Sequence, residues 1–367
     1  MRICFIALGK FTHIDAYIDH FKARGHEVHF VALAPGPPRD VPMHNVGSNE
    51  RLLRLTGKWS YLPAILRARR VVRRLAPDIV HAHYATSAGL AAYICGVHPY
   101  IVTAHGTDVT RGVRSVVWRP ILAKIFKHAH WVNPVSDELR EMVLDLGIPR
   151  EKVETLTLGI DTKRFSFQPP KPRGPSTPLR CICTRKFEKV YDHRTIIIGM
   201  AILAKQGLDF RLTLIGDGSL REQLRSLAIN QGIAGRTTFV GAVPNSRLPE
   251  LLANQDIYLS ASRSDGTSLS LLEAMASGVY PVVSEITANS VWIKHSYNGL
   301  LHKAANPQSL AEQVSNTIRT PESIRAALQY NRELVVKSGD RTNNMSRLEE
   351  IYRSQCFPNL QNNHSSS

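Results

Sequence analysis

The sequence lacks any apolar run of the roughly 18 residues that suggest a membrane-spanning helix, so any membrane contact is expected to be peripheral. It has only five cysteines, an odd number whose spacing matches neither a disulfide framework nor a zinc site. Cys181 and Cys183 alternate within an apolar run, which predicts a buried structural pair and a reducing compartment. The start, Met1–Gly9, lacks a small-residue cleavage site and predicts a first β-strand rather than a signal peptide.

Acidic residues are scarce: 30 Asp and Glu stand against 46 Lys and Arg, giving a net charge of +16. Such a chain prefers anionic partners. Nucleic acid is disfavoured because no binding motif accompanies the charge. Between Arg51 and Arg74, eight cations without any acid are interleaved with apolar residues such as Trp59 and Leu62. This pattern predicts docking on an anionic membrane surface, and its alternative is a solvated helix face over an ordinary core stripe.

The order of apolar runs and helical stretches predicts an α/β protein with two Rossmann-like domains. The first domain spans 1–165, a proline-rich linker spans 166–178, and the second domain spans 179–340. A C-terminal helix over 341–357 is expected to pack back toward the first domain, and 358–367 is expected to be a disordered tail. Ligands of open parallel sheets bind beyond the carboxyl ends of strands, so we expect a central cleft between two such edges.

The sequence indicates the bounds of several strands and of the C-terminal helices. Largely apolar runs of strand length occupy Tyr100–Ala104, Trp131–Pro134 and Phe210–Ile215, as expected for buried parallel strands. The last part of the chain is helical from about Ser309, with breaks near Pro321 and Gly339.

The segment with the most chemical information is Ser264–Gly278, which reads SDGTSLSLLEAMASG and follows a predicted strand. A loop containing Gly266 leads into a helix for which Thr267 or Ser268 is the expected cap. Amides at a helix N-terminus favour negative charge, so a phosphate is expected there. Glu273 lies about five residues into the helix, roughly 7–8 Å beyond its start. That is about the reach from a nucleotide's phosphate to its ribose.

This segment resembles the Glu-x7-Glu signature of the family 4 retaining glycosyltransferases, which have the GT-B fold, two Rossmann-like domains facing a central cleft. The ending LEAMASG matches fully, while Asp265 stands at the first Glu and Gly266–Ser268 replace Gly-Phe-Gly. The resemblance implies that Glu273 binds the ribose and that the amides of Gly266, Thr267 and Ser268 hold the distal phosphate. It also implies that Asp265 touches the transferred sugar.

Smaller marks of the family run along nearly the whole chain, at residues 77–83, 102–108, 135–139, 158–165, 214–220 and 239–243. They imply that His105 contacts the transferred sugar or the nucleophile. Gly216 and Gly218 would form a donor loop, or alternatively only a tight turn, and Val243 would lie beside the base. The remaining residues implied to face the acceptor or the cleft are Gly9, Lys10, His13 and Asp108.

A basic loop follows the first strand of the second domain. Arg185 stands where the family has a pyrophosphate-binding Arg, but Val190 stands where its Lys is expected. Lys189 is the implied substitute and Lys186 a poorer one; the alternative is a solvated basic loop. Fixed cations and helix amides can stabilise charge on a leaving phosphate without a metal, and no metal-ligand cluster is visible. The alternation of His81 and His83 on one strand suggests a metal site, but no carboxylate or Cys cluster completes it, so packing or polar bonding is the favoured interpretation.

The resemblance therefore implies a retaining, metal-independent hexosyltransferase that needs no cofactor besides its donor substrate, a UDP- or GDP-sugar. The first domain would bind a glycan or lipid-linked acceptor and the second the donor. The enzyme would be cytoplasmic, peripheral on the inner face of the cell membrane, and active in surface polysaccharide or lipopolysaccharide synthesis. The alternatives are a sugar-nucleotide epimerase of the same fold and a non-catalytic anionic-lipid-binding protein. An NAD-dependent oxidoreductase is disfavoured because the first strand is not followed by Gly-x-Gly-x-x-Gly.

Overall fold

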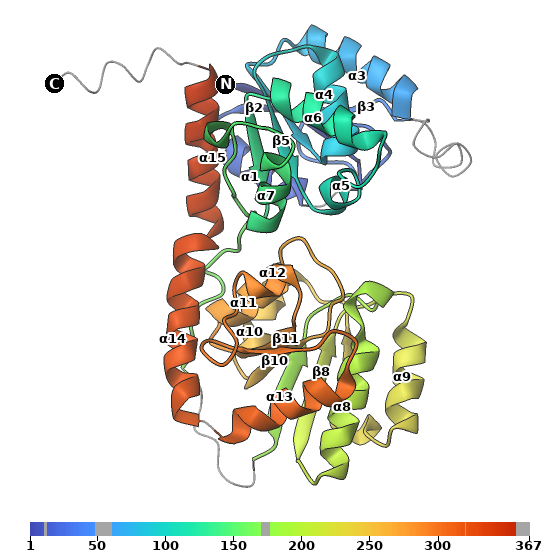
Figure 1. The fold of residues 1–367 in the computed structure, drawn as a ribbon, viewed down its shortest axis with the longest axis vertical. Helices are drawn as coiled ribbons and strands as arrows, with labels where there is room; N and C mark the ends of the chain where they lie inside the picture. Colours follow the sequence, from blue (N-terminus) through green and yellow to red (C-terminus); the bar gives the residue numbers. More distant parts are fainter. Residues whose placement is uncertain (11–12, 48–60, 170–176, 320, 357–367) are drawn as a thin grey trace, which may run out of the picture. The chain divides into compact units, whose positions relative to one another are not determined.

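The chain forms two compact units in a computed structural model that describes residues 1–10, 13–47, 61–169, 177–319 and 321–356 (Figure 1). Unit 1 comprises Met1–Leu158 and the chain from Thr342 onward, and unit 2 comprises Gly159–Arg341. Outside the described residues lie most of the predicted linker, the predicted tail 358–367, and Arg51, Arg54, Lys58 and Trp59. Among the described residues, no helix has both the length and the apolar character needed to cross a membrane.

Unit 1 is built on a parallel six-stranded sheet in the order β3-β2-β1-β4-β5-β6. Its strands are β1 (Arg2–Ala7), β2 (Glu27–Ala32), β3 (Met43–Asn45), β4 (Ile79–His83), β5 (Tyr100–Ala104) and β6 (Trp131–Pro134). The neighbouring strands β4 and β5 are buried along their whole length, as expected inside a parallel sheet. The carboxyl ends of β1, β4 and β5 therefore lie next to one another at one edge of the sheet.

Helices cover both faces of this sheet (Figure 1). They are α1 (Ile14–Ala23), α3 (Tyr61–Leu75), α4 (Leu90–Cys95), α5 (Thr107–Thr110), α6 (Trp118–His128), α7 (Asp137–Leu144) and α15 (Arg341–Cys356), with a π-helix η2 (Ala85–Gly89) between β4 and α4. The C-terminal α15 belongs to the core of unit 1. Tyr352 stacks on Phe21 at 4.8 Å between ring centroids, and the buried Glu349 carboxylate accepts hydrogen bonds from Arg24 and Arg353.

Unit 2 repeats the architecture with a second parallel sheet in the order β12-β11-β10-β7-β8-β9. Its strands are β7 (Leu179–Cys183), β8 (Phe210–Ile215), β9 (Thr237–Gly241), β10 (Ile257–Ser260), β11 (Tyr280–Ser284) and β12 (Leu300–His302). Its helices are α8 (His193–Lys205), α9 (Arg221–Asn230), α10 (Leu248–Leu252), α11 (Leu269–Ala276), α12 (Thr287–Ser290), α13 (Pro307–Arg319) and α14 (Pro321–Ser338). The predicted α/β class is confirmed. Because β7 and β10 are neighbours, the loops that follow them meet at one edge.

By its contacts, the chain passes from unit 1 to unit 2 between Leu158 and Gly159, so residues 159–165 pack with unit 2. The N–H of Ile160 donates to the Gly339 carbonyl at 2.8 Å, and the Arg332 guanidinium donates to the carbonyl of Phe165 at 2.6 Å. These bonds join the segment to the end of α14. Sequence patterns do not reveal such pairings, because the partners lie more than 150 positions apart.

Candidate functional site

Arg185, in the loop after β7, is held in one orientation by three groups. Its guanidinium pairs with the Asp265 carboxylate, donates to the Ser270 hydroxyl at 3.4 Å, and lies 4.2 Å above the centre of the Tyr191 ring. Asp265 belongs to the loop after β10, so the ion pair joins two neighbouring strand ends. The structure thus brings together two residues predicted from separate motifs. Tyr191 and Ser270 were missed, because neither stands at a position that a motif marks.

The loop of Gly266, Thr267 and Ser268 leads directly into α11. The Asp265 carboxylate accepts the Gly266 N–H at 3.0 Å, which fixes the first turn of the loop. The helix begins at one of the two predicted caps, but without the expected side-chain bond. Ser268 is the N-cap residue, but its hydroxyl makes no capping bond, and its backbone carbonyl instead accepts the N–H groups of Leu271 and Leu272. The helix start nevertheless lies beside the Arg185 cation, where an anion is favoured.

Glu273 lies in the second turn of α11 and is only 7% exposed. Its carboxylate accepts a hydrogen bond from the Asn245 side-chain amide at 3.4 Å. Burial raises the pKa of Glu273 to about 7, against the opposing effects of Asn245 and of the arginines Arg341, Arg185 and Arg164. A carboxylate that is largely desolvated before any ligand arrives accepts strong hydrogen bonds from hydroxyl groups.

The glycine loop after β8 packs tightly against the Arg185 loop. A Cβ on Gly216 would lie 2.3 Å from the Arg185 carbonyl oxygen, and one on Gly218 would lie 2.6 Å from that of Phe187. Both glycines also have positive φ, 147° and 158°, which disfavours other residues there. This shows that the glycines set the spacing of two loops. Val243, after β9, is half-buried and packs on the hydrophobic cluster beneath α11.

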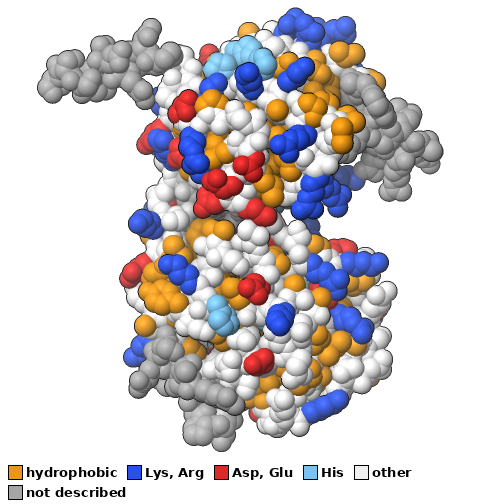
Figure 2. Space-filling view, viewed as in Figure 1, with side chains coloured by type: hydrophobic (Ala, Val, Ile, Leu, Met, Phe, Trp, Pro, Cys, Tyr) orange, Lys and Arg blue, Asp and Glu red, His pale blue; other side chains and the backbone are white. Residues whose placement is uncertain are grey.

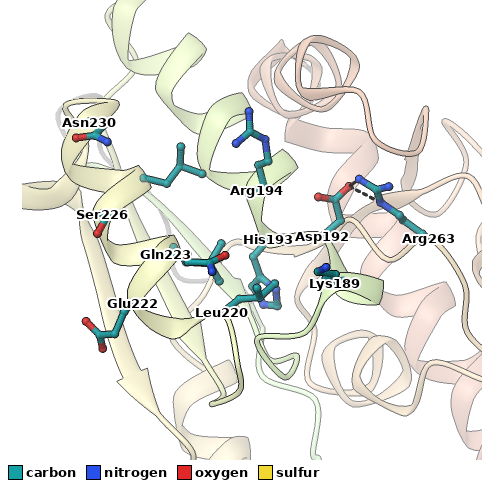
Figure 3. Close-up of a pocket in the computed structure, with 12 residues that line it drawn as sticks. Lys189, Asp192, His193, Arg194, Leu220, Glu222, Gln223, Ser226, Asn230 and Arg263 are labelled. Carbon is teal, nitrogen blue, oxygen red and sulfur yellow. Dashed lines mark hydrogen bonds and ion pairs between the residues drawn. The ribbon is translucent and has the colours of Figure 1, made fainter.

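Lys189 lies on the wall of a groove of about 670 Å³ between α8 and α9 (Figure 3). Arg194 and Arg263 add two more cations to the groove, and Arg263 pairs with the buried Asp192 at 3.0 Å. The N–H of Arg263 also donates to the Val190 carbonyl at 2.8 Å, so this residue fastens the Lys189 loop to the end of β10. Neither Glu273 nor Asp265 lines the groove.

In unit 1, His105 lies at the carboxyl end of β5. A 3.2 Å hydrogen bond joins its Nε2 to Nδ1 of His83, at the end of β4. Burial, with a smaller effect of the nearby His13, lowers the pKa of His105 to about 3, so the ring is neutral at pH 7. Asp108 differs from the expectation of a cleft-facing acid. Its carboxylate is 2% exposed and accepts the backbone N–H groups of Ala85, Gly106 and His105.

The loop after β1 carries the remaining predicted residues of unit 1. A Cβ on Gly9 would lie 2.2 Å from the Ala34 carbonyl oxygen, so this glycine permits close packing of two loops. Lys10 and His13 are exposed at the same edge of the sheet. His81 is buried within β4. Its ring is hydrogen bonded to the hydroxyl groups of Tyr352 and Thr103, in agreement with the favoured interpretation of polar bonding. Within the residues described, no group of three or more His, Cys, Asp or Glu is placed to hold a metal.

Two doubly wound units of this kind define the GT-B class of fold, and a solved structure agrees. The Anabaena protein HepE in complex with UDP superimposes with a TM-score of 0.78 over 96% of this chain and all of its own, at 16% identity. At such identity the likeness shows the fold alone.

Sequence comparison gives the family. The profile of Glycosyltransferase Family 4 matches residues 9–164, and that of Glycosyl transferases group 1 matches residues 165–334. The N-acetyl-alpha-D-glucosaminyl L-malate synthase of Bacillus anthracis is 27% identical over 90% of this chain and 89% of its own. The amylovoran biosynthesis glycosyltransferase AmsK of Erwinia amylovora is 26% identical over 68% of this chain and 63% of its own. The chain belongs to the family 4 glycosyltransferases of the GT-B fold.

Proposed function

We propose that this glycosyltransferase acts with retention of configuration and transfers a sugar from a UDP- or GDP-sugar to a glycan or glycolipid acceptor. The observation that carries the proposal is the arrangement of Arg185, Asp265 and Glu273 around the start of α11. A role in polysaccharide or other glycan synthesis is supported by the similarity to AmsK, a glycosyltransferase of amylovoran biosynthesis, and a nucleotide-sugar donor by the UDP bound in HepE.

In this proposal the donor lies along the edge of unit 2. Arg185 and the amides before α11 hold the distal phosphate, and Glu273 accepts the ribose hydroxyls. Asp265 has a double role, because it orients Arg185 and lies where the transferred sugar is expected. As the sugar–phosphate bond breaks, the fixed guanidinium and amides stabilise the growing charge, so no divalent metal is needed. Lys189 contributes positive charge from the neighbouring groove.

The edge of unit 1 is proposed to bind the acceptor. His105 faces the sugars as a neutral hydrogen-bonding group, because protonation of its half-buried ring is disfavoured. Lys10 and His13 extend this edge. Asp108 acts as a positioning residue, since its carboxylate binds the two strand ends together and the residue is only 2% exposed.

Thermal melting of the purified chain with UDP, GDP and ADP tests the donor class. A nucleotide at 100 times its dissociation constant adds about 2.7 kcal/mol of apparent stability. We expect UDP or GDP to stabilise the protein and ADP to do so less. The same melting temperature with UDP, with GDP, with ADP and in buffer alone would contradict nucleotide-sugar transfer.

Donor affinity should depend on pH through Glu273. The ribose hydroxyls donate to the ionised carboxylate, so binding favours the deprotonated form and releases a proton wherever Glu273 is protonated in the free chain. With the folded-state pKa at about 7, affinity for UDP-glucose or GDP-mannose should fall as pH drops below 7, approaching tenfold per unit. Calorimetry between pH 5.5 and 8 in buffers of different ionisation enthalpy measures both effects. A flat profile, or the same profile in Glu273→Gln, would contradict the ribose role.

We also propose that α3 docks unit 1 on an anionic membrane. Lys and Arg side chains lie beside hydrophobic ones over unit 1 (Figure 2). On α3, Leu66 is 61% exposed and Arg70 and Arg74 are exposed, while Arg67 and Arg73 donate to the carbonyls of Val46 and Cys95. Leu66, Arg70 and Arg74 are therefore the available docking groups. Arg67 and Arg73 also hold the helix in place.

Replacing Arg70 and Arg74 with Gln should weaken binding to vesicles that contain anionic phosphatidylglycerol. At about 1 kcal/mol per cation near such a surface, the double variant should bind roughly 30-fold more weakly at low salt. A flotation assay measures this. The matched control, Arg150→Gln with Arg211→Gln, removes two exposed cations elsewhere and should float like the wild type. If both pairs behave alike, α3 is only a solvated face.

A further inference from the structure

The residue after β4, Tyr84, has a backbone conformation that side chains rarely adopt. Its φ is 89° and its ψ 103°, whereas the other described non-glycine residues with positive φ range from 42° to 64°. Tyr84 also directly precedes the π-helix η2, and such irregular turns are frequent at functional sites. Strain of this kind persists only where the surroundings fix it, and it clusters at ligand-binding positions.

The surroundings of Tyr84 do fix it. Its N–H donates to the Thr103 carbonyl at 3.1 Å, and its carbonyl accepts the Gly89 N–H at 3.1 Å. The next N–H, that of Ala85, donates to the buried Asp108 carboxylate at 2.7 Å. The Tyr84 hydroxyl is hydrogen bonded to the Thr107 hydroxyl, one residue beyond Gly106. The ring is therefore anchored at both of its ends.

This anchoring sets the Tyr84 ring nearly parallel to that of His105. The angle between the two planes is 15° and the centroids are 6.4 Å apart. Tyr84 is a half-buried residue, whereas burial of the His105 ring lowers the pKa of that histidine. The Tyr84 ring, held nearly parallel to that of His105 at the edge of β4 and β5, has a flat aromatic face, and the exposed Thr107 lies beside it.

We propose that Tyr84 stacks on the ring of the acceptor sugar and helps to select acceptors by an unsubstituted pyranose face. The C–H groups on one face of a pyranose are apolar and match a flat aromatic surface, while its hydroxyls point outward to polar neighbours. The proposal rests on the proposed function, because that function places the acceptor at the edge of unit 1. It explains why a strained backbone is retained here, where glycine would fit more easily.

Four variants of the full-length chain separate the ring from the backbone. Tyr84→Gly and Tyr84→Ala both remove the ring, but only Gly also relieves the strain at positive φ, so Tyr84→Gly should melt at a higher temperature than Tyr84→Ala. Tyr84→Phe keeps the stacking surface. Tyr93→Ala removes another half-buried tyrosine of unit 1 and is the control.

The probes are the methyl pyranosides of glucose, galactose, mannose and N-acetylglucosamine, with UDP or GDP present. Their dissociation constants are measured by saturation-transfer NMR titration. At least one pyranoside should bind roughly tenfold more weakly to both ring-less variants, despite their different stabilities, and nearly normally to Tyr84→Phe and Tyr93→Ala. Affinity for UDP-glucose and GDP-mannose should not change.

Three results would overturn the proposal. The first is that the wild type binds none of the pyranosides. The second is that the variants without the ring bind all of them normally, and the third is that these variants lose affinity for a nucleotide sugar instead of a pyranoside. Stabilisation by the nucleotide in the same samples reports on the proposed function. If it persists while pyranoside binding does not depend on Tyr84, the stacking role alone is wrong.

Discussion

Replacing Glu273 with Gln is expected to weaken binding of UDP- or GDP-sugars by roughly 10- to 150-fold, because a hydrogen bond to a charged group contributes about 1.5–3 kcal/mol. The amide has the shape of the carboxylate, and its oxygen can still accept from Asn245. It cannot, however, accept strong hydrogen bonds from two ribose hydroxyls. Transfer should fall in parallel with affinity.

The same substitution should leave the melting temperature unchanged or raise it. The pKa of Glu273 is higher in the folded chain, about 7, than its ordinary value of 4.5. The free energy of unfolding therefore falls as pH rises from the pKa of Glu273 in the unfolded chain to its pKa in the folded chain. This loss is complete above pH 7. A neutral Gln avoids that loss, so any gain should appear at pH 8 and vanish near pH 4.

Glu285→Gln, at an exposed position of unit 2, is the matched control and should change neither affinity nor melting. Calorimetric titration of the wild type and the two variants at pH 8, with melting curves at pH 8 and near pH 4, tests these expectations. If Glu273→Gln bound nucleotide sugars with normal affinity, the assignment of Glu273 to the donor site would be wrong. A large drop in melting temperature would instead show that its carboxylate is needed for folding.

Replacing Arg185 with Met should lower kcat by roughly 100- to 1000-fold, the usual effect of removing one fixed group that stabilises developing negative charge. The guanidinium cannot be replaced by a mobile ion, because the Asp265 carboxylate, the Tyr191 ring and the Ser270 hydroxyl together set its orientation. Arg185→Lys should recover only part of the activity, since an ammonium group lacks the planar fork that contacts all three.

Removing Arg185 alone leaves the partly buried Asp265 carboxylate without its cation, which lowers stability as well. The double variant Arg185→Met with Asp265→Asn removes both charges and should melt closer to the wild type while remaining inactive. Steady-state kinetics at saturating donor distinguish the cases. If the double variant regains normal kcat, the ion pair has only a structural role and the leaving phosphate is stabilised elsewhere.

Much of the fold was predictable because buried parallel strands leave a local signal. The runs Tyr100–Ala104, Trp131–Pro134 and Phe210–Ile215 are observed with the predicted bounds, since each is largely apolar and of strand length. The predicted breaks near Pro321 and Gly339 are confirmed by the ends of α13 and α14. Proline and glycine act through their own backbones, so their effect can be seen without knowing the tertiary contacts.

The site was less predictable because its geometry depends on partners distant in sequence. A motif marks Arg185 and Asp265 separately, but nothing local shows that they pair across 80 positions. Asp108 lies in a segment resembling the family, yet only the structure shows its carboxylate turned inward to Ala85. The positive φ of Tyr84 leaves no trace in the sequence either, because tyrosine carries no preference for that conformation.

The central claim is tested most directly by the anomeric configuration of the product. The full-length chain, freed of metals with EDTA, is incubated with UDP-glucose, UDP-galactose, UDP-N-acetylglucosamine or GDP-mannose and the four methyl pyranosides, and the products are examined by proton NMR. The account predicts that at least one α-linked donor gives an α-linked disaccharide and an equal amount of free nucleoside diphosphate. A β-linked product, an epimerised donor without transfer, or activity that returns only with Mg²⁺ or Mn²⁺ would contradict it.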